Sequence, residues 1–201
     1  GADAIYPGFG FLDENASFAE KCKESGFEFV GPDSKVIEVM GDKIKAKKLI
    51  ESLGVPTVPG YTGKIESQNQ IESTVEQIGY PVIVKASSGG GGRGMRVVHK
   101  RDELWDSIIG AQNEAKRAFG NGEVFIEKYL KKPRHIEIQI FGDGKGRVVH
   151  LYSRDCSLQR KYQKIVEEAP AKNVNHEKLS EIQNICVKAC SELKYKGAGT
   201  L

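Results

Sequence analysis

The residues best suited to chemistry form a glycine-rich segment between two apolar runs. It reads Lys85-Ala-Ser-Ser-Gly-Gly-Gly-Gly-Arg-Gly-Met95. Consecutive glycines let several backbone N–H groups turn toward one point, and such a concavity suits phosphate oxygens. Lys85 and Arg93 would neutralise charge there. The sequence therefore predicts that residues 88–94 bind phosphates, and the alternative is a glycine hinge between strands.

Two familiar nucleotide motifs do not explain this segment. The spacing GxGxxG occurs at Gly89, Gly91 and Gly94, but a dinucleotide-binding fold requires a helix directly afterwards. Residues 95–99 have the pattern of a strand instead. The P-loop pattern, GxxxxGK followed by Ser or Thr, is absent. A phosphate-binding loop between two strands is the interpretation that remains.

A second candidate is the strictly alternating segment 135–141. His135, Glu137 and Gln139 share one face of this predicted strand, opposite three isoleucines. Three basic residues precede it: Lys128, Lys132 and Arg134. The polar face therefore lines a charged cleft or, on the alternative interpretation, faces solvent.

The polar segment 154–164 is predicted to be a loop that could bind a small anion such as bicarbonate, phosphate or carboxylate. A solvated loop without a ligand is the alternative.

Cys186 and Cys190 are one helical turn apart without a matching pair for zinc, which favours core packing. Cys156 lies between arginines in sequence, but no nearby residue could act as its base.

The elements that must position these residues are predicted strands and helices that alternate along the sequence. This alternation predicts an α/β fold. The predicted strands are 2–6, 27–30, 81–86, 95–99, 123–128, 135–141 and 147–152, the last two forming a hairpin. The predicted helices are 14–25, 42–53, 103–118 with Asp102 as its cap, and one opened by Asn175. Apolar stripes are expected at Leu104, Ile108, Ala111, Ala115 and Phe119, at Ala46, Leu49, Ile50 and Leu53, and at Leu179, Ile182, Cys186, Ala189 and Leu193. Residues 54–60 contain two prolines and predict a linker.

Composition excludes several classes of protein. The 201 residues are 39% hydrophobic and 28% charged, with a net charge of +3, which favours neither a nucleic-acid nor a membrane partner. Four cysteines do not make a disulfide framework, so we expect a reducing, cytoplasmic setting. The chain begins and ends in predicted strands, and we expect it to be a piece of a longer polypeptide.

Seven segments, taken in order, resemble the biotin carboxylase family, whose members are ATP-grasp ligases. They are 4–15, 40–43, 85–95, 127–130, 133–135, 154–159 and 163–164. The resemblance covers essentially the whole chain. It implies the end of a Rossmann-like N-terminal domain at 1–41 and an ATP-grasp lid subdomain with its entry helix and linker at 42–130. It also implies the start of the larger ATP-grasp subdomain at 131–201.

The resemblance also implies roles for particular residues. Those matching ATP-binding positions are Lys43 and Lys85 on the phosphates, Gly91 and Gly92 in the loop, Glu127, Lys128, Tyr129 and Leu130 along the adenine edge, and His135, Gln159 and Tyr162. Lys164 matches a lysine that holds bicarbonate, and Phe9 and Gly10 match the site that receives biotin. Tyr162 stands where the family usually has a histidine, and a phenol cannot carry that residue's positive charge. Tyr6, Asp13 and Ser88 also depart from the usual residues.

The expected parent enzyme carboxylates biotin on a carrier protein or domain, using ATP, Mg²⁺ and bicarbonate through carboxyphosphate. It is expected to be a homodimer in the cytoplasm or, in a eukaryote, the mitochondrial matrix. The resemblance places the magnesium ligands, the catalytic arginine and a biotin-binding arginine after the position of Leu201. We therefore expect little turnover from this chain alone. Two alternatives remain: another ATP-grasp ligase and a non-catalytic nucleotide-binding module.

Overall fold

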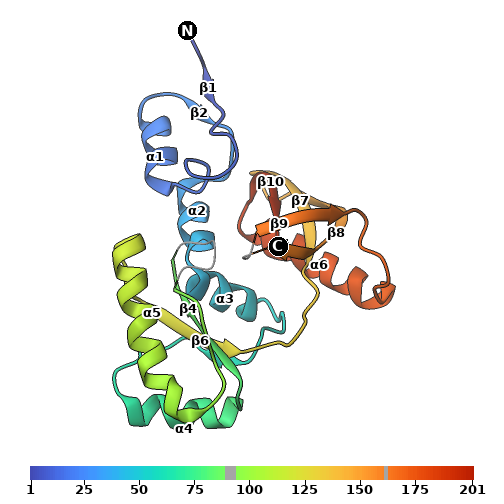
Figure 1. Cartoon of the computed structure of the whole chain (residues 1–201). Helices are drawn as coiled ribbons and strands as arrows, with labels where there is room; N and C mark the ends of the chain where they lie inside the picture. The colour runs from blue at the N-terminus through green and yellow to red at the C-terminus, as the bar shows by residue number, and fades with distance from the viewer. Residues whose placement is uncertain (89–93, 161–162) are drawn as a thin grey trace.

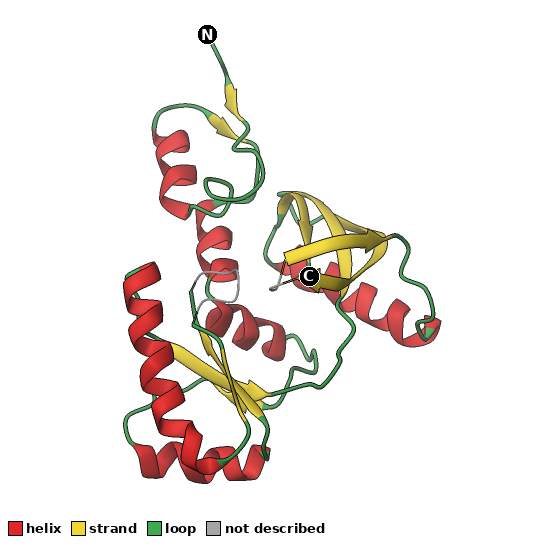
Figure 2. Ribbon diagram, viewed as in Figure 1, coloured by secondary structure: helices red, strands yellow, loops and turns green. Residues whose placement is uncertain are grey.

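The computed structural model describes residues 1–88, 94–160 and 163–201. It confirms a mixed α/β fold, in which helices and strands form three groups with separate hydrophobic cores (Figures 1 and 2). The described strands make one two-stranded parallel sheet and two four-stranded antiparallel sheets.

The N-terminal group contains β1 (Ala4–Ile5), α1 (Ala16–Glu24), β2 (Glu28–Phe29) and α2 (Ser34–Gly41). Strands β1 and β2 pair in parallel. The side chain of Asn15 caps α1 by accepting a hydrogen bond of 2.8 Å from the N–H of Phe18. Ala19, Cys22, Phe29 and Ile37 form the core. Both predicted strands and the first helix are present with shorter bounds, whereas α2 was not predicted.

Helix α3 (Lys43–Ser52) follows α2 and leads to the second group (Figure 1). Its first turn is capped by Asp42, whose carboxylate accepts hydrogen bonds from the N–H groups of Ile44 and Lys45. The helix was predicted, but its buried face was not. Ile44 is its buried residue, whereas the predicted stripe at Ala46, Leu49, Ile50 and Leu53 is only partly buried.

The second group is a sheet with the strand order β3–β6–β4–β5. Its elements are β3 (Gly60–Tyr61), α4 (Gln68–Ile78), β4 (Val82–Ala86), β5 (Arg96–Val98), a short 3₁₀ turn (Arg101–Glu103), α5 (Leu104–Phe119) and β6 (Val124–Lys128). Helices α4 and α5 cover one face, where Ile71, Val84, Leu104, Ile108 and Ile126 are fully buried. Because strand side chains alternate, Lys85 and Glu127 lie on the opposite face.

The α5 stripe is confirmed at Leu104, Ile108, Ala111 and Ala115, and Phe119 is half-buried. The predicted cap is wrong: Asp102 lies inside the 3₁₀ turn, and α5 begins without a side-chain cap. Helix α4 and strand β3 were not predicted, and Gly60, the last residue of the predicted linker 54–60, belongs to β3.

The third group is a sheet with the order β10–β7–β8–β9, covered by α6. Its elements are β7 (Ile136–Asp143), β8 (Val148–Arg160), β9 (Gln163–Glu168), α6 (His176–Glu192) and β10 (Lys196–Thr200). The core consists of Ile138 and Ile140 from the sheet and Cys186 and Cys190 from α6. The predicted hairpin and the Asn175 cap of α6 are confirmed.

Two predictions for this group are wrong. The segment 154–164 is not a loop, because residues 154–160 belong to β8 and residues 163–164 to β9. Both faces of this part of the sheet carry polar side chains, so the strands lack the apolar alternation that would reveal them. Ile182 is 46% exposed, and Gln183 is buried on α6 instead.

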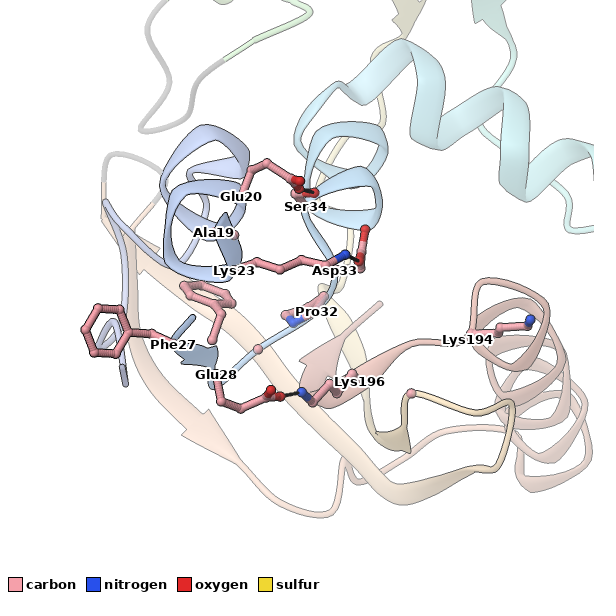
Figure 3. A pocket seen from close by; sticks show the side chains of 13 residues that line it. Ala19, Glu20, Lys23, Phe27, Glu28, Pro32, Asp33, Ser34, Lys194 and Lys196 are labelled. Carbon is pink, nitrogen blue, oxygen red and sulfur yellow. Dashed lines mark hydrogen bonds and ion pairs between the residues drawn. The ribbon is translucent and has the colours of Figure 1, made fainter. Parts of the chain in front are cut away.

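The first and third groups meet at a cavity of about 240 Å³ (Figure 3). Glu28 of β2 pairs with the ammonium of Lys196 on β10 across it. On the N-terminal side Glu20 accepts a hydrogen bond from the Ser34 hydroxyl, and Lys23 lies 3.7 Å from Asp33. Polar contacts therefore line the place where the two groups touch.

Candidate functional site

The start of α3 lies beside the end of β4, where the glycine-rich segment begins. The backbone N–H of Lys43 donates to the carbonyl of Ser87 at 3.1 Å. The Lys43 ammonium is 3.4 Å from the carbonyl of Ala86. Burial, and then the nearby charge of Lys85, lower the pKa of Lys43. Two of the predicted phosphate lysines, on different elements, thus lie close enough to repel each other.

Lys85 is held by a buried carboxylate. Its ammonium is 2.7 Å from Oε2 of Glu127 on the neighbouring strand β6. The other oxygen, Oε1, is 2.8 Å from the ammonium of Lys47 on α3. Burial raises the pKa of the Glu127 carboxyl, but hydrogen bonds from Lys47 and Lys85 outweigh it and leave the pKa below its ordinary value. Glu127 is therefore an anion shared by two lysines.

The two ends of the glycine-rich segment are anchored by its neighbours. The Asn121 amide lies 3.3 Å from the hydroxyls of Ser87 and Ser88. Gly94 has a φ of +67°, and a Cβ there would lie 3.0 Å from the Cβ of Ala86, so this position requires glycine. Gly91 and Gly92, predicted to cover the nucleotide, lie outside the described residues.

A second buried carboxylate, Glu137, lies on the polar face of β7. It is 5% exposed and contacts two cationic side chains, Lys164 and Arg154, the latter at 3.0 Å, and also the Nε2 atom of His135 at 3.2 Å. Burial raises its pKa, but the hydrogen bond and charge of Lys164, followed by Arg154, bring the net pKa below the ordinary value.

The predicted residues of the third group come together around Glu137. The side-chain amide of Gln159 lies 2.8 Å from Nδ1 of His135 and donates to the carbonyl of Cys156 at 2.8 Å. Lys164 reaches the same carboxylate from β9. The polar face of β7 is therefore a charged cluster and not a plain solvent-facing surface. Tyr162 lies outside the described residues.

The end of β6 and the first residues after it carry the four residues matched to the adenine edge. The Lys128 ammonium donates to the carbonyls of Gly79 and Tyr80, and the N–H of Tyr129 donates to the carbonyl of Pro81 at 3.0 Å. Leu130 is 48% exposed. The Lys128 side chain thus supports the sheet, and a nucleotide contact from Lys128 would have to come from its backbone.

Phe9 and Gly10, matched to the biotin site, lie in a turn after β1. Phe9 is 92% exposed, and the N–H of Gly10 donates to the Asp13 carboxylate at 2.8 Å. Within the described ranges, no hydrogen bond or ion pair joins either residue to the two carboxylate clusters.

Sequence reasoning missed two members of these clusters, Lys47 and Arg154. Arg154 contacts Glu137, Gln139 at 2.6 Å and Glu167 at 3.2 Å. A charged residue on a strand with polar neighbours was the available signal, but its partners are set by sheet register.

Over residues 1–88, 94–160 and 163–201, no three His, Cys, Asp or Glu side chains gather to hold a metal. In the same part of the chain, no helix is long and apolar enough to cross a membrane.

Basic side chains are held by buried carboxylates at two antiparallel sheets, and a glycine-rich segment separates β4 from β5. These features suit a nucleotide site of the ATP-grasp class. The family model "Carbamoyl-phosphate synthase L chain, ATP binding domain" matches residues 42–201. The model "Biotin carboxylase, N-terminal domain" matches residues 1–37. The chain belongs to the biotin carboxylase family.

Curated and solved relatives agree with this assignment. The chain is 52% identical over its whole length to the biotin carboxylase of Pseudomonas aeruginosa, of which it spans 45%. A complex of Campylobacter jejuni biotin carboxylase with β-γ-ATP is 44% identical and has a TM-score of 0.94, over 99% of this chain and 45% of that one. Another solved structure is the biotin carboxylase domain dimer of Hydrogenobacter thermophilus 2-oxoglutarate carboxylase, in complex with MgADP, ADP and bicarbonate. It is 48% identical with a TM-score of 0.93, and the match covers 99% of this chain and 44% of that one. The chain therefore spans slightly less than half the length of these relatives.

Proposed function

We propose that this chain carries the ATP- and bicarbonate-binding residues of a biotin carboxylase. The observation that carries the proposal is the pair of buried carboxylates, Glu127 and Glu137, each holding cationic side chains that match ligand-binding positions. Side chains held in this way are pre-oriented, and phosphoryl transfer depends mainly on positioning and charge neutralisation.

In the proposed reaction a bicarbonate oxygen attacks the γ-phosphate of ATP, which gives carboxyphosphate and ADP. The carboxyl group then passes to a ring nitrogen of biotin as its bond to phosphate breaks, and the proton of that nitrogen passes to the released phosphate. Lys43 and Lys85 would neutralise the ATP phosphates, and Lys164 would hold bicarbonate. Mg²⁺ would screen charge between the phosphates. The described residues supply cations for the phosphates but no acidic cluster for the metal.

The other binding roles follow the same resemblance. The backbone of residues 127–130 would bind the adenine edge, with His135, Gln159 and Tyr162 as further ATP contacts. Gly91 and Gly92 would cover the nucleotide, and Phe9 and Gly10 would receive biotin. We also propose the division into an N-terminal part at 1–41, a lid subdomain at 42–130 and the start of the larger subdomain at 131–201.

The whole protein is proposed to act on biotin attached to a carrier protein or domain and to be a homodimer. Its activity is tested with the full-length polypeptide, ATP, Mg²⁺, bicarbonate and free biotin. We expect ADP release that requires both bicarbonate and biotin. If ADP release does not depend on biotin, the protein is another ATP-grasp ligase. If the protein binds ATP without turnover, it is a nucleotide-binding module.

The match of residues 1–37 to the biotin carboxylase N-terminal domain favours our proposal over a carbamoyl-phosphate synthase. We further propose that the 201-residue chain alone turns over little ATP, because the resemblance places the magnesium ligands after the position of Leu201.

A further inference from the structure

Lys47 is a buried lysine that the proposed reaction does not use. It lies one helical turn after Lys43 on α3, on the same side of the helix. Its side chain is 9% exposed. Its ammonium donates to the carbonyl of Val58 and to Oε1 of Glu127, the latter at 2.8 Å. A long, flexible cation is costly to bury, so its two acceptors hold it in one place.

The two lysines that share Glu127 are not equivalent. The Lys85 side chain is 28% exposed and contacts Glu127 alone among the charged residues described in its surroundings. Lys47 is much less exposed and has a backbone acceptor as well. Lys47 is thus the fixed partner of the carboxylate, and Lys85 is the one that can turn toward solvent or a ligand.

We propose that Lys47 is a positioning residue for ATP binding: it keeps Glu127 paired while Lys85 turns to a nucleotide phosphate. This inference rests on the proposed function, in which Lys85 contacts the phosphates. Lys47, Lys85 and Glu127 together carry a net charge of +1. One positive charge is therefore available to the nucleotide without leaving a buried carboxylate alone.

The alternative arrangement shows why Lys47 matters. Without it, Lys85 and Glu127 would form a neutral pair, and a phosphate would have to compete with Glu127 for Lys85. Glu127, whose side chain is 12% exposed, would be stranded once Lys85 moved. Removing one partner of a buried ion pair is strongly unfavourable, because the remaining charge has lost its solvent and its counterion. The penalty would appear only when phosphates bind.

The test compares Lys47→Met with Lys48→Met in the full-length protein, by calorimetric titration with ATP and with adenosine. Lys48 is the next residue on α3 and is exposed, so it controls for loss of one positive charge from the helix. We expect Lys47→Met to weaken ATP binding about tenfold or more while adenosine binding stays within about twofold. Lys48→Met should change neither affinity beyond the screened effect of a surface charge.

Two further variants make the test specific. Lys47→Arg should restore ATP affinity, because a guanidinium keeps the charge and can still reach the carboxylate. In a Glu127→Gln background no carboxylate can be stranded, so adding Lys47→Met should change the ratio of ATP to adenosine affinity by less than about twofold. This second comparison also remains valid if the single variant fails to fold.

Equal weakening of ATP and adenosine by Lys47→Met, or full loss of ATP affinity in both backgrounds, would overturn the inference and assign Lys47 a purely structural role. An unchanged ATP affinity would overturn it as well. If the unmodified protein binds ATP no more tightly than adenosine, the proposed function itself fails, a result distinguishable from the others because it needs no variant.

Discussion

At the scale of single residues, buried carboxylates organise the cations of this chain. Glu137 holds Lys164, Arg154 and His135, and the carboxylate is almost inaccessible to solvent. The Lys164 and Arg154 side chains are each partly exposed, so the common anion keeps their positive charges within one small volume.

Replacing Glu137 with glutamine should therefore destabilise the fold. We expect a loss of about 1–3 kcal/mol in the free energy of unfolding, less than for a fully buried pair because the partner side chains are 25% and 35% exposed. Urea denaturation of the unmodified and variant chains measures this difference in the free energy of unfolding. The matched control is Glu167→Gln, whose side chain is 43% exposed beside Arg154, and it should cost less than about 1 kcal/mol. Equal losses for the two variants would contradict the central role of Glu137.

The same residue predicts a pH dependence. Because the pKa of Glu137 is lower in the folded chain than in the unfolded one, its ionised form stabilises the fold above the unfolded pKa. That contribution falls as the pH drops through the folded pKa. The difference in unfolding free energy between the unmodified chain and Glu137→Gln should thus be largest near neutral pH and shrink on acidification. Denaturation curves at several pH values test this, and a difference that grows in acid would contradict it.

Sequence reasoning found the cations but not how they are held. Lys43, Lys85 and Lys164 stand in recognisable segments, and His135 and Gln159 do meet in the fold. Lys47 and Glu127 are 80 positions apart, and their contact depends on how α3 packs against the β6 strand. No local pattern encodes such a pairing. Periodicity also placed Glu137 on the correct face, but its burial depends on the Lys164, Arg154 and His135 side chains that contact it.

At the scale of elements, apolar periodicity was reliable wherever one face meets a core. Helix α5 and strands β4, β6 and β7 carry clear patterns and appear as predicted. The prediction of a loop at 154–164 was wrong because the strand residues there have charged cross-strand partners and so show no apolar pattern. The contact of Arg154 with Glu137 is an example. Helix α2 buries Val36 and Ile37 within eight residues, which is about two turns and too short a stretch for the helical pattern to be distinguished.

Helix α5 gives a direct test of the second group's core. Ile108 is fully buried between α5 and the sheet, whereas its neighbour Ile109 is 40% exposed. Ile108→Ala should lower the free energy of unfolding by about 2–5 kcal/mol, because it removes buried methyl groups and leaves a cavity. Ile109→Ala should change it by about 0.5 kcal/mol or less, as a surface substitution. Thermal or urea unfolding of both variants would show the contrast, and similar losses would mean that α5 packs differently.

At the scale of the whole molecule, the three cores share few contacts. Helix α3 joins the first group to the second, and Lys47 ties it to the sheet through Glu127. The first and third groups meet beside the cavity shown in Figure 3. There the ion pair of Glu28 with Lys196 joins β2 to β10, and Gly31, shortly after β2, lies near Gly197 of β10.

The left-handed backbone conformation of Gly197 should matter more to stability than the ion pair. Glu28 and Lys196 have side chains 62% and 43% exposed, so Glu28→Gln should cost less than about 1 kcal/mol, and salt should erase most of that loss. Gly197 has a φ of +87°, which an L-residue adopts only with strain, and a Cβ there would lie 3.7 Å from the Cα of Gly31. Gly197→Ala should therefore cost about 1–2 kcal/mol at any salt concentration. Urea midpoints at low and high sodium chloride separate the two effects. If Glu28→Gln proves the more damaging variant, the ion pair contributes more to stability here than the backbone conformation of Gly197 does.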